Sequence, residues 1–382
     1  MSIDLQRPQP KRLLVVFGTR PEALKCFPVV RAAMARPGIT TRVCITAQHR
    51  EMVDRIVELT GMPVHDDLDV MRPGQTLAGV TAQVLAGVQK VIEAFRPDAI
   101  LVQGDTTTAM AAALAAFYQR IPVAHVEAGL RSHDINSPFP EELNRRVLGD
   151  LAKWHFAPTE QARRNLLAEG KDQASVFVTG NTVIDTLLHF SNALDADLAL
   201  SASFAERFDF LDPTRKLILV TGHRRENFDG GIDRICTALN HLAARADTQI
   251  VYPVHPNPSV RDIVERRLEG TPNLILTDPL DYLPFLYLLK GSYLVLTDSG
   301  GIQEEAPALG KPVLVMRENT ERPEGVEAGT ARLVGTDVDK IVSTAIQLLE
   351  QESAYRQMAE THNPYGDGRA GERIVDLLAS RI

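Results

Sequence analysis

Short apolar runs alternate with amphipathic segments along most of the chain. Runs of four to eight apolar residues are typical of buried strands, and the segments between them have the spacing of amphipathic helices. Strands alternating with helices predict parallel sheets in an α/β fold. The strands predicted in the first half of the chain are RLLVVFG (12–18), TRVCIT (41–46), DAILVQGD (98–105), IPVAHVEAG (121–129) and VFVTGN (176–181).

A second series of strands begins after a break in this rhythm. The segment 182–210 contains no strand-like run, so we expect it to join two doubly wound, Rossmann-like domains. We place the first domain at 1–182 and the second at 183–365, and we expect a terminal helix at 366–382 after the turn NPYGDG. The strands predicted in the second half are KLILVTGHRREN (216–227), TQIVYPVHPNP (248–258), PNLILTD (272–278), SYLVLTDSGG (292–301) and KPVLVM (311–316).

Polar, often glycine-containing segments follow most of these strands. Ligands of open α/β sheets bind beyond the carboxyl ends of the strands. Arg or His occurs in most of these segments, which loop chemistry alone does not explain. If the strand ends of two domains face each other, a ligand lies in the cleft between them. The segments are FGTRPE, TAQHR, QGDTTT, HVEAGLR, TGHRREN, PVHPNP and TDSGG.

Composition and charge exclude several classes of protein. The 382 residues are 44% apolar and 24% charged, as in a soluble globular chain of two domains. No apolar stretch approaches the roughly 20 residues that span a bilayer, and the N-terminus lacks an apolar signal core, which argues against secretion. A net charge of −8 argues against general binding of nucleic acids. Three cysteines without metal-ligand or redox spacing predict buried, reduced thiols.

The segment TDSGGIQEE (297–305) has two interpretations. Glycines at a strand-to-helix turn let a ligand approach the backbone, and the N–H groups at a helix start attract phosphate. Ser299 adds a hydroxyl donor, and a glutamate beside a phosphate can accept the two hydroxyls of a ribose. Alternatively, the segment is only a tight turn, because carboxylates in the first helical turns suit the helix dipole without any ligand.

Cations and acids in the other segments extend this pattern. Arg20 and Lys25 flank a helix start marked by Pro21, where a bound anion would offset their charge. His223 lies beside Arg224 at another strand exit, and a histidine there can contact phosphate or act as an acid. Acids at strand ends are candidates for proton transfer, although each alone is more often a helix cap or a surface charge; Asp105 is a fair N-cap by itself. The acids are Asp105, Glu127, Glu141 and Glu142.

Several chemistries lack their motifs. No G-x-G-x-x-G follows a strand, so nicotinamide or flavin binding by the usual fingerprint is unsupported. The sequence contains no P-loop, no constellation of metal ligands and no G-x-S-x-G elbow. We therefore expect no metal and no redox cofactor.

A set of motifs in fixed order resembles one enzyme family. The order and spacing of these motifs resemble those of the non-hydrolysing UDP-N-acetylglucosamine 2-epimerases from about residue 12 to the end of the chain. The motifs are FGTRPEALK, TAQHREM, QGDTTT, HVEAGLR, SPFPEELNR, HFAPTE, GNTVIDT, GHRREN, TDSGGIQEEAP, ERPEGVEAGT and NPYGDG.

The resemblance implies a fold, a reaction and a cellular role. It implies the two-domain glycosyltransferase-B-like architecture, with the ligand in the interdomain cleft and the terminal helix 366–382 packed back on the first domain. It implies a cytoplasmic homodimer that interconverts UDP-N-acetylglucosamine and UDP-N-acetylmannosamine for surface polysaccharide. The C2 hydrogen of this sugar is beside no carbonyl, so we expect UDP to be eliminated to give a glycal and then added back, without a cofactor.

The resemblance also implies roles for individual residues. Asp105, Glu127 and Glu141 resemble the catalytic carboxylates, although the proton acceptor and the proton donor are not assigned among them. His223 resembles a catalytic or phosphate-contacting histidine. The residues expected to bind UDP are Arg20, Lys25, His223, Ser299, Gly300, Gly301, Glu305, which would take the ribose, and Arg322, near the nucleotide or the sugar.

Some bacterial members of the family are activated by UDP-N-acetylglucosamine at a second site. Gln48, Glu51, Arg224 and His255 match positions associated with that site. In members with the site an arginine precedes the element QTL, whereas Gly74 occupies that position here. Activation by substrate therefore remains an open alternative.

Other functions fit much of the same pattern. A 2-epimerase for a modified UDP sugar, such as a diacetamido uronate, would differ only at the sugar end of the pocket. A hydrolysing relative would release N-acetylmannosamine and UDP. A UDP-sugar glycosyltransferase would share the grip on UDP but leave the three acids without a role, and a sensor of nucleotide sugars would bind UDP without turnover.

Overall fold

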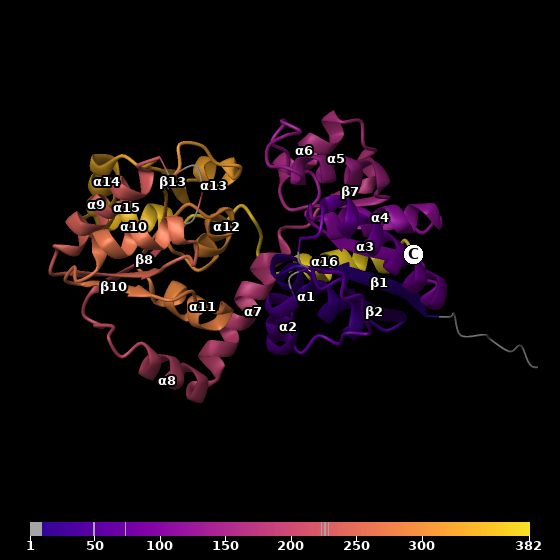
Figure 1. Cartoon of the computed structure of the whole chain (residues 1–382), viewed down its shortest axis with the longest axis horizontal. Coiled ribbons are helices and arrows are strands. Elements are labelled where there is room, and N and C mark those ends of the chain that lie inside the picture. Colours follow the sequence, from indigo (N-terminus) through magenta and orange to yellow (C-terminus); the bar gives the residue numbers. More distant parts are fainter. Residues whose placement is uncertain (1–9, 49, 73, 223, 225–226, 228) are drawn as a thin grey trace, which may run out of the picture. The chain divides into compact units, whose positions relative to one another are not determined.

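The computed structural model describes residues 10–48, 50–72, 74–222, 224, 227 and 229–382, which form two compact units (Figure 1). The first unit comprises the described residues up to Thr186 together with Gly366–Ile382. The second unit is Leu187–Tyr365. This division lies close to the predicted domain boundary after residue 182. The domain boundary itself stays a prediction.

The first unit is built on a parallel sheet with the strand order β3-β2-β1-β4-β5-β6-β7. The strands pair in regular parallel register, with Val15 opposite Val43 on one side and Leu101 on the other. Strand β3 extends the sheet at one edge, and β6 and β7 extend it at the other. Strand β7 was predicted, whereas β3 and β6 were not. The strands are β1 (Lys11–Phe17), β2 (Ile39–Ile45), β3 (Asp66–Asp67), β4 (Ala99–Gln103), β5 (Val123–Val126), β6 (Trp154–Ala157) and β7 (Val176–Val178).

Helices cover both faces of this sheet. Helices α3 and α4 pack on each other and, with β1 and β4, form one hydrophobic core. Helix α4 is rich in alanine, and its small side chains are almost fully buried between the sheet and α3. The helices of this unit are α1 (Arg20–Ala35), α2 (Arg50–Thr60), α3 (Leu77–Phe95), α4 (Thr107–Tyr118), α5 (Glu141–Leu151), α6 (Glu160–Ala168), the first turn of α7 (Thr182–Ala196) and α16 (Ala370–Ala379).

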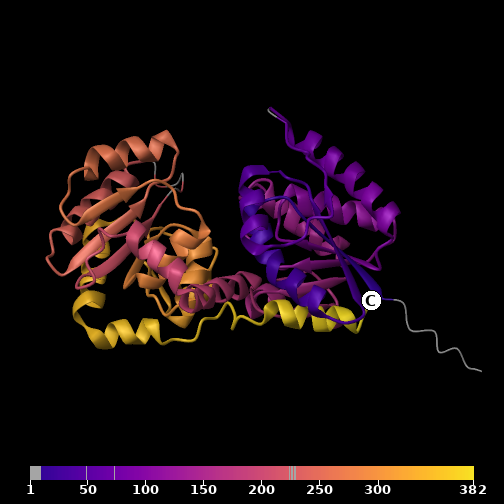
Figure 2. The same cartoon turned by 90° about the horizontal axis from the view of Figure 1, so that it is seen from below.

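The C-terminal helix α16 lies along α1, although the two are far apart in sequence (Figure 2). A Cβ atom on Gly371 would lie 2.8 Å from the carbonyl carbon of Pro28, so glycine permits the close approach of the helices. The carboxylate of Asp185 accepts hydrogen bonds from the N–H groups of Ala370 (3.2 Å) and Gly371 (2.8 Å). These bonds fix the start of α16 to the first turn of α7.

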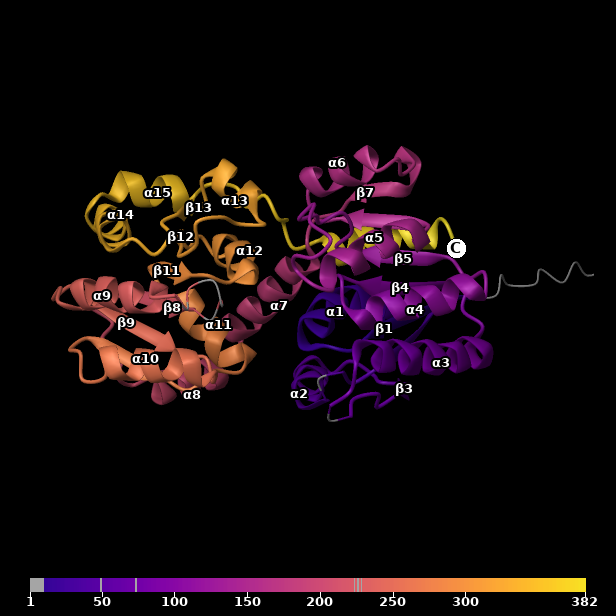
Figure 3. The same cartoon turned by 45° about the horizontal axis from the view of Figure 1, so that its top comes forward.

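The second unit contains a parallel sheet with the order β10-β9-β8-β11-β12-β13 (Figure 3). Helices α9, α10 and α14 pack together on one face, while α11 lies on the other face (Figure 1). The strands are β8 (Lys216–Thr221), β9 (Thr248–Pro253), β10 (Leu274–Thr277), β11 (Leu294–Thr297), β12 (Val313–Val315) and β13 (Ala331–Leu333). The remaining helices are α8 (Leu198–Arg207), α9 (Gly231–Ala243), α10 (Pro258–Leu268), α11 (Tyr282–Gly291), α12 (Gly300–Ala308), α13 (Pro323–Ala328), α14 (Val338–Glu350) and α15 (Glu352–Ala359).

The direction of winding reverses in each sheet between two central strands. These strands are β1 and β4 in the first unit and β8 and β11 in the second. Ligand sites of open α/β sheets lie at such reversals, beyond the carboxyl ends of the strands. The fold therefore directs attention to the turns after β1, β4, β8 and β11. Across the described part of the chain, no helix is both long and apolar enough to cross a bilayer. The thiols of Cys26, Cys44 and Cys236 are free and buried, as predicted.

Candidate active site

The turn after β1 is held in one conformation by a buried glutamate. Glu22 Oε2 accepts hydrogen bonds from the N–H groups of Gly18 (3.0 Å) and Thr19 (2.8 Å), which completes a capping box at the start of α1. Thr106, at the start of α4, donates its hydroxyl to Glu22 Oε1 (2.6 Å). Burial is the main reason that the pKa of Glu22 is raised to about 7. This carboxyl group joins the turn that carries Arg20 to the turn that carries Asp105.

The same turn leaves no room for a side chain at Gly18. A Cβ atom there would lie 2.0 Å from Thr46 Oγ1 and 2.6 Å from Thr108 Oγ1. Thr108 also donates to Gln48 Oε1 (3.1 Å). The backbone after β1 is therefore packed directly against the end of β2 and the start of α4.

Glu127 follows β5 directly and is fixed by three donors. It has a φ of +63°, a left-handed conformation that is uncommon for a residue other than glycine. Its carboxylate accepts hydrogen bonds from Lys25 Nζ (2.5 Å), from Asn181 Nδ2 (3.0 Å) and from Gln103 Nε2. Left-handed residues that are held by their surroundings cluster at functional sites, so we regard Glu127 as a strong candidate.

Asp105 follows β4 and faces helix α5. Its carboxylate accepts a hydrogen bond from Arg145 Nε (2.8 Å), and its backbone carbonyl accepts one from Asn144 Nδ2 (2.8 Å). The alternative that Asp105 is only an N-cap does not hold, because Thr106 caps α4 by accepting from the N–H of Ala109 (3.0 Å). The carboxylate of Asp105 is thereby left for another role.

The preceding residue, Gly104, is held by a buried histidine. His125 Nε2 donates to the carbonyl oxygen of Gly104 (2.7 Å), which requires a proton on that nitrogen. Burial is the main cause that lowers the pKa of His125 to about 4, so the ring is neutral at physiological pH. The histidine supports the turn into Asp105.

The adjacent acids Glu141 and Glu142 have different environments at the start of α5. Glu142 is buried and accepts hydrogen bonds from the N–H of Ser132 (3.0 Å) and from Arg145 Nη1 (3.2 Å). Burial opposes its ionisation, but the Ser132 N–H and Arg145 more than offset this and lower the pKa of Glu142. Glu141 is half-buried and has no hydrogen-bond or ion-pair partner among the described residues. Glu142 therefore has a structural environment, whereas Glu141 is available for chemistry.

In the second unit, helix α12 begins at Gly300 directly after Ser299. The Ser299 hydroxyl makes no capping bond, and its backbone N–H donates to Thr297 Oγ1 (2.9 Å). A Cβ atom on Gly300 would lie 3.3 Å from Glu321 Oε1, 3.8 Å from Arg224 Nη2 and 3.9 Å from Arg322 Cζ. Glycine thus lets the Glu321 carboxylate approach the N-terminus of α12, with two guanidinium groups close by. Backbone N–H groups at this helix start favour an anion.

Ion pairs order the cations around this helix start. The Arg322 guanidinium pairs with the buried carboxylate of Glu304. Glu321 accepts from Arg317 Nη1 (2.6 Å) and Arg224 Nη2 (3.3 Å). Burial raises the pKa of Glu321, but the charge of Arg317 and further contacts outweigh it and hold the pKa at about 2.

The turn after β8 is fixed to the turn after β11. Asp298 Oδ2 accepts hydrogen bonds from the N–H of Arg224 (2.8 Å) and from Asn227 Nδ2 (3.3 Å). The hydroxyls of Thr221 and Thr297 lie 2.6 Å apart at the ends of the two strands. His223, predicted as a catalytic or phosphate-contacting residue, lies outside the described residues.

The structure brings together only part of the predicted set within each unit. Arg20, Lys25, Asp105, Glu127 and Glu141 lie in the first unit, at the carboxyl ends of its strands or at helix starts that follow them. The residues that surround α12 in the second unit include Ser299, Gly300, Gly301 and Arg322, and Glu305 lies partly exposed on that helix. Of the residues predicted for a second site, Gln48 and Glu51 belong to the first unit and Arg224 and His255 to the second.

Several residues with evident structural roles had no role in the sequence prediction. Glu22, Gln103, Arg145 and Asn181 each bind a predicted site residue or the turn that carries it. Gln103 and Asn181 occur in the motifs QGDTTT and GNTVIDT, so those motifs were the available signal.

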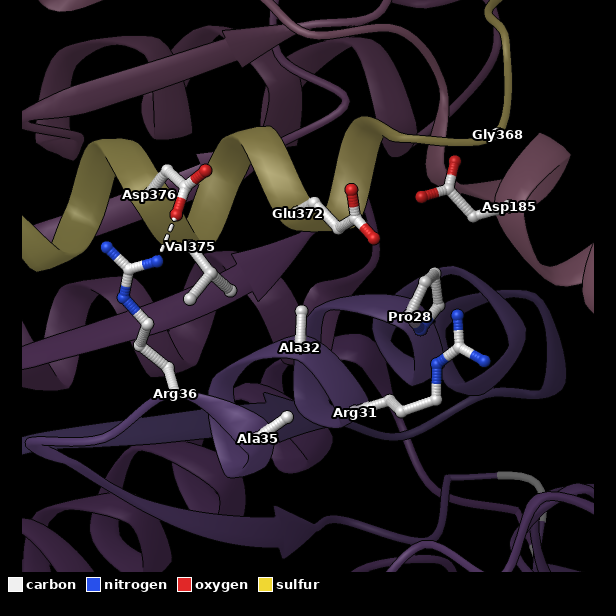
Figure 4. A pocket seen from close by; sticks show the side chains of 10 residues that line it. All are labelled: Pro28, Arg31, Ala32, Ala35, Arg36, Asp185, Gly368, Glu372, Val375 and Asp376. Atoms are coloured by element: carbon white, nitrogen blue, oxygen red, sulfur yellow. Dashed lines mark hydrogen bonds and ion pairs between the residues drawn. The ribbon is translucent and has the colours of Figure 1, made fainter.

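A groove of about 510 Å³ between α1 and α16 contains none of the predicted site residues (Figure 4). Arg36 and Asp376 form an ion pair across it (2.6 Å), and Asp185 and Glu372 point into it near Gly368. Burial raises the pKa of Asp185 to about 6. Within the described ranges, no group of three His, Cys, Asp or Glu side chains could hold a metal ion.

The fold and the two groups of side chains define a two-domain α/β protein of the glycosyltransferase-B-like class. A family model described as UDP-N-acetylglucosamine 2-epimerase matches residues 31–379. The chain belongs to the UDP-N-acetylglucosamine 2-epimerase family.

Curated relatives and solved structures agree with this assignment. The chain is similar to the UDP-N-acetylglucosamine 2-epimerase of Yersinia pestis, with 56% identity over 96% of this chain and 98% of the relative. The corresponding protein of Escherichia coli K12 is 53% identical over the same shares. The crystal structure of UDP-GlcNAc 2-epimerase from Neisseria meningitidis bound to UDP-GlcNAc is 47% identical, with a TM-score of 0.90 over 97% of this chain and 100% of that chain.

Proposed function

We propose that the chain interconverts UDP-N-acetylglucosamine and UDP-N-acetylmannosamine by inverting the configuration at C2. The observation that carries the proposal is the pair of carboxylates after neighbouring strands of the first sheet, Asp105 after β4 and Glu127 after β5. Family membership and a relative that binds UDP-GlcNAc support the choice of substrate.

In this proposal, residues of the second unit bind UDP. The N-terminus of α12 and the backbone at Gly300 and Gly301 favour the diphosphate, and the nearby guanidinium groups add positive charge. Ser299 offers a hydroxyl that is not used as a cap. We assign the ribose hydroxyls to Glu305 and the nucleotide or the sugar to Arg322.

The first unit supplies the groups for proton transfer. Arg20 stands at the start of α1, where its charge suits a phosphate. Lys25 donates to Glu127, which supports a role in orienting that carboxylate; direct contact of Lys25 with the diphosphate stays a prediction. His223 stays a proposed acid or phosphate ligand.

The proposed reaction proceeds by elimination and addition. A carboxylate removes the C2 proton, the C2–H electron pair forms the C1–C2 double bond, and the C1–O bond breaks with its electrons leaving on UDP. UDP then adds back to C1 of the glycal while a proton is delivered to the opposite face of C2. The sequence of steps is redox-neutral, and donors around the diphosphate stabilise the charge on the departing UDP. Asp105, Glu127 and Glu141 are the candidates for base and acid.

Incubation with UDP-N-acetylglucosamine in deuterated water, followed by proton NMR, tests the proposal. The expected result is UDP-N-acetylmannosamine with deuterium at C2. Release of free N-acetylmannosamine and UDP would instead identify a hydrolysing enzyme. Binding of UDP without any turnover would exclude this substrate and leave a modified UDP sugar, a transferase or a sensor.

Family membership also supports further proposals. We propose that the enzyme is a cytoplasmic homodimer that supplies precursors of surface polysaccharide, and sedimentation of the purified protein tests the dimer. A second UDP-N-acetylglucosamine site at Gln48, Glu51, Arg224 and His255 would give sigmoidal initial rates. Gly74, in place of an arginine, argues for hyperbolic rates instead.

A further inference from the structure

Asn181 connects the candidate catalytic residue Glu127 to the start of helix α7. Its side chain is buried, with 2% of its surface exposed. Asn181 Nδ2 donates to Glu127 Oε1 (3.0 Å), and Asn181 Oδ1 accepts from the N–H of Val183 (3.1 Å). The amide can be placed in only one way, because the N–H of Val183 requires the oxygen on its side. One side chain therefore fixes both a carboxylate and a helix start.

Helix α7 carries the chain from the first unit to the second. The division between the units falls after Thr186, within the second turn of this helix. The Thr186 hydroxyl donates to the carbonyl oxygen of Leu24 (2.6 Å), next to Lys25. The start of α7 is thus attached to α1 at the residue before the lysine that also binds Glu127.

The returning chain passes the same residue. It re-enters the first unit at Gly366, whose φ is +140°. A Cβ atom on Gly366 would lie 3.4 Å from the backbone nitrogen of Asn181 and 3.5 Å from Gly180 Cα. Both passages of the chain between the units therefore lie beside Asn181.

We propose that Asn181 is a positioning residue. It orients the carboxylate of Glu127, and this orientation depends on where the start of α7 lies. The inference rests on the proposed function, in which Glu127 transfers a proton at C2. Lys25 and Gln103 also hold Glu127, but both belong to elements inside the first unit. Asn181 alone among these three donors lies at the passage to the second unit.

Substitutions at 181 can separate the two bonds of the side chain. Aspartate caps helices as well as asparagine does, so Asn181→Asp keeps the acceptor for Val183 and places a carboxylate against Glu127. Serine is also a good cap, and Asn181→Ser replaces the amide donor with the hydroxyl of a shorter side chain and adds no charge. Thr182→Val is the matched control, because the buried Thr182 hydroxyl has no hydrogen-bond partner in the described part of the chain.

The decisive measurement is the steady-state epimerisation of UDP-N-acetylglucosamine by these variants across a range of pH. We expect Asn181→Asp to lower kcat by about tenfold or more, with KM changed by less than about threefold, because a hydrogen bond to a charged group is lost. The acidic limb of the pH profile should move to higher pH, because a second carboxylate beside Glu127 disfavours its ionisation. Lys25 on α1 still favours the ionised form, and His125 on β5 is neutral. Asn181→Ser should fall between Asn181→Asp and the wild type, and Thr182→Val should retain wild-type kcat.

Thermal unfolding and UDP binding separate positioning from a merely structural role. A kcat of Asn181→Asp equal to that of the wild type would overturn the inference. A loss of kcat in Asn181→Ser that is fully explained by a smaller fraction of folded protein would also overturn it. Asn181→Ser replaces Asn181→Asp in the test if the aspartate variant fails to fold. If the wild type does not turn over UDP-N-acetylglucosamine, the proposed function fails and the inference fails with it. If the wild type is active and Asn181→Asp equally so, only the inference fails.

Discussion

Lys25 Nζ lies 2.5 Å from Oε1 of Glu127, and both side chains are largely buried. An ion pair in such a place is costly to break, because the remaining charge stays in an environment that solvates it poorly. The pair also joins α1 to the end of β5 and keeps a residue with positive φ in one orientation. Lys25 therefore helps to hold the candidate catalytic carboxylate in place.

Replacement of Lys25 by methionine should show this directly. Methionine keeps much of the volume but removes the charge beside Glu127. We expect kcat to fall by about tenfold or more, since a charge-assisted hydrogen bond to Glu127 is lost. Steady-state kinetics provide the measurement, and Lys90→Met, at an exposed position of α3, is the control. Equal kcat values in the two variants would exclude a role of Lys25 in turnover.

Asp105→Asn should abolish most of the turnover without unfolding the protein. The amide can still bond to Arg145, which also pairs with Glu142, so no buried charge loses all its partners. Loss of one acid or base should reduce kcat by about a hundredfold or more. Solvent deuterium incorporation at C2 and circular dichroism at rising temperature together provide the measurement. A variant that exchanges the C2 proton at the wild-type rate would exclude Asp105 as an acid or a base.

Glu141 and Glu142 should respond in opposite ways to substitution by glutamine. Glu142→Gln should lower the free energy of unfolding by about 1–3 kcal/mol, because a buried carboxylate that binds Ser132 and Arg145 becomes neutral. Glu141→Gln should lower kcat and leave that free energy nearly unchanged. Denaturant unfolding and steady-state kinetics of both variants test the contrast. The reverse pattern would mean that the functional acid of this pair is Glu142.

Glu22 should make the protein less stable as the pH rises towards neutrality. Its folded pKa of about 7 exceeds the ordinary value of 4.5, so the folded state holds a proton that the unfolded state has lost between these two values. The stabilisation is complete below pH 4.5 and is lost as the pH rises through 7, by about 3 kcal/mol in all. Urea unfolding of the wild type and Glu22→Gln at several pH values isolates this contribution. An unchanged difference between the two proteins from pH 4.5 to 7.5 would refute it.

Gly300→Ala should weaken the binding of UDP. The added methyl group would lie 3.3 Å from Glu321 Oε1 and close to Arg322, in the space that we assign to a phosphate oxygen. We expect the dissociation constant to rise by about tenfold, as the cost of a displaced polar contact implies. Calorimetric titration with UDP measures it. Gly291→Ala is the control, because a Cβ atom there would have no atom within 4 Å.

The sequence predicted the strands that are long and apolar. The strands β1, β4, β8 and β11 lie at the middle of their sheets and have nearly continuous apolar sequences. The edge strands β3 (Asp66–Asp67) and β13 (Ala331–Leu333) were missed, because two or three residues do not establish a period. The strand β6 (Trp154–Ala157) was also missed, although all four of its residues are buried.

The sequence predicted individual residues of the candidate site but not the contacts between them. Acids and cations at strand ends were visible in the sequence, but their partners are distant in the chain. Asn181 and Glu127 are separated by 54 residues, and Arg145 and Asp105 by 40. The alternative of Asp105 as a cap could not be excluded from the sequence, because Asp105 and Thr106 are both good capping residues and only the backbone geometry decides between them. The assignment of roles to these residues stays a prediction.

The helix pair α1 and α16 has a consequence for synthesis of the protein on the ribosome. Helix α16 belongs to the first unit, but it is translated after the whole of the second unit. The surface of α1 around Pro28 that Gly371 contacts must therefore stay uncovered while the second unit is made. Domains usually fold in the order of their synthesis, but here the first unit cannot be completed before the second has emerged.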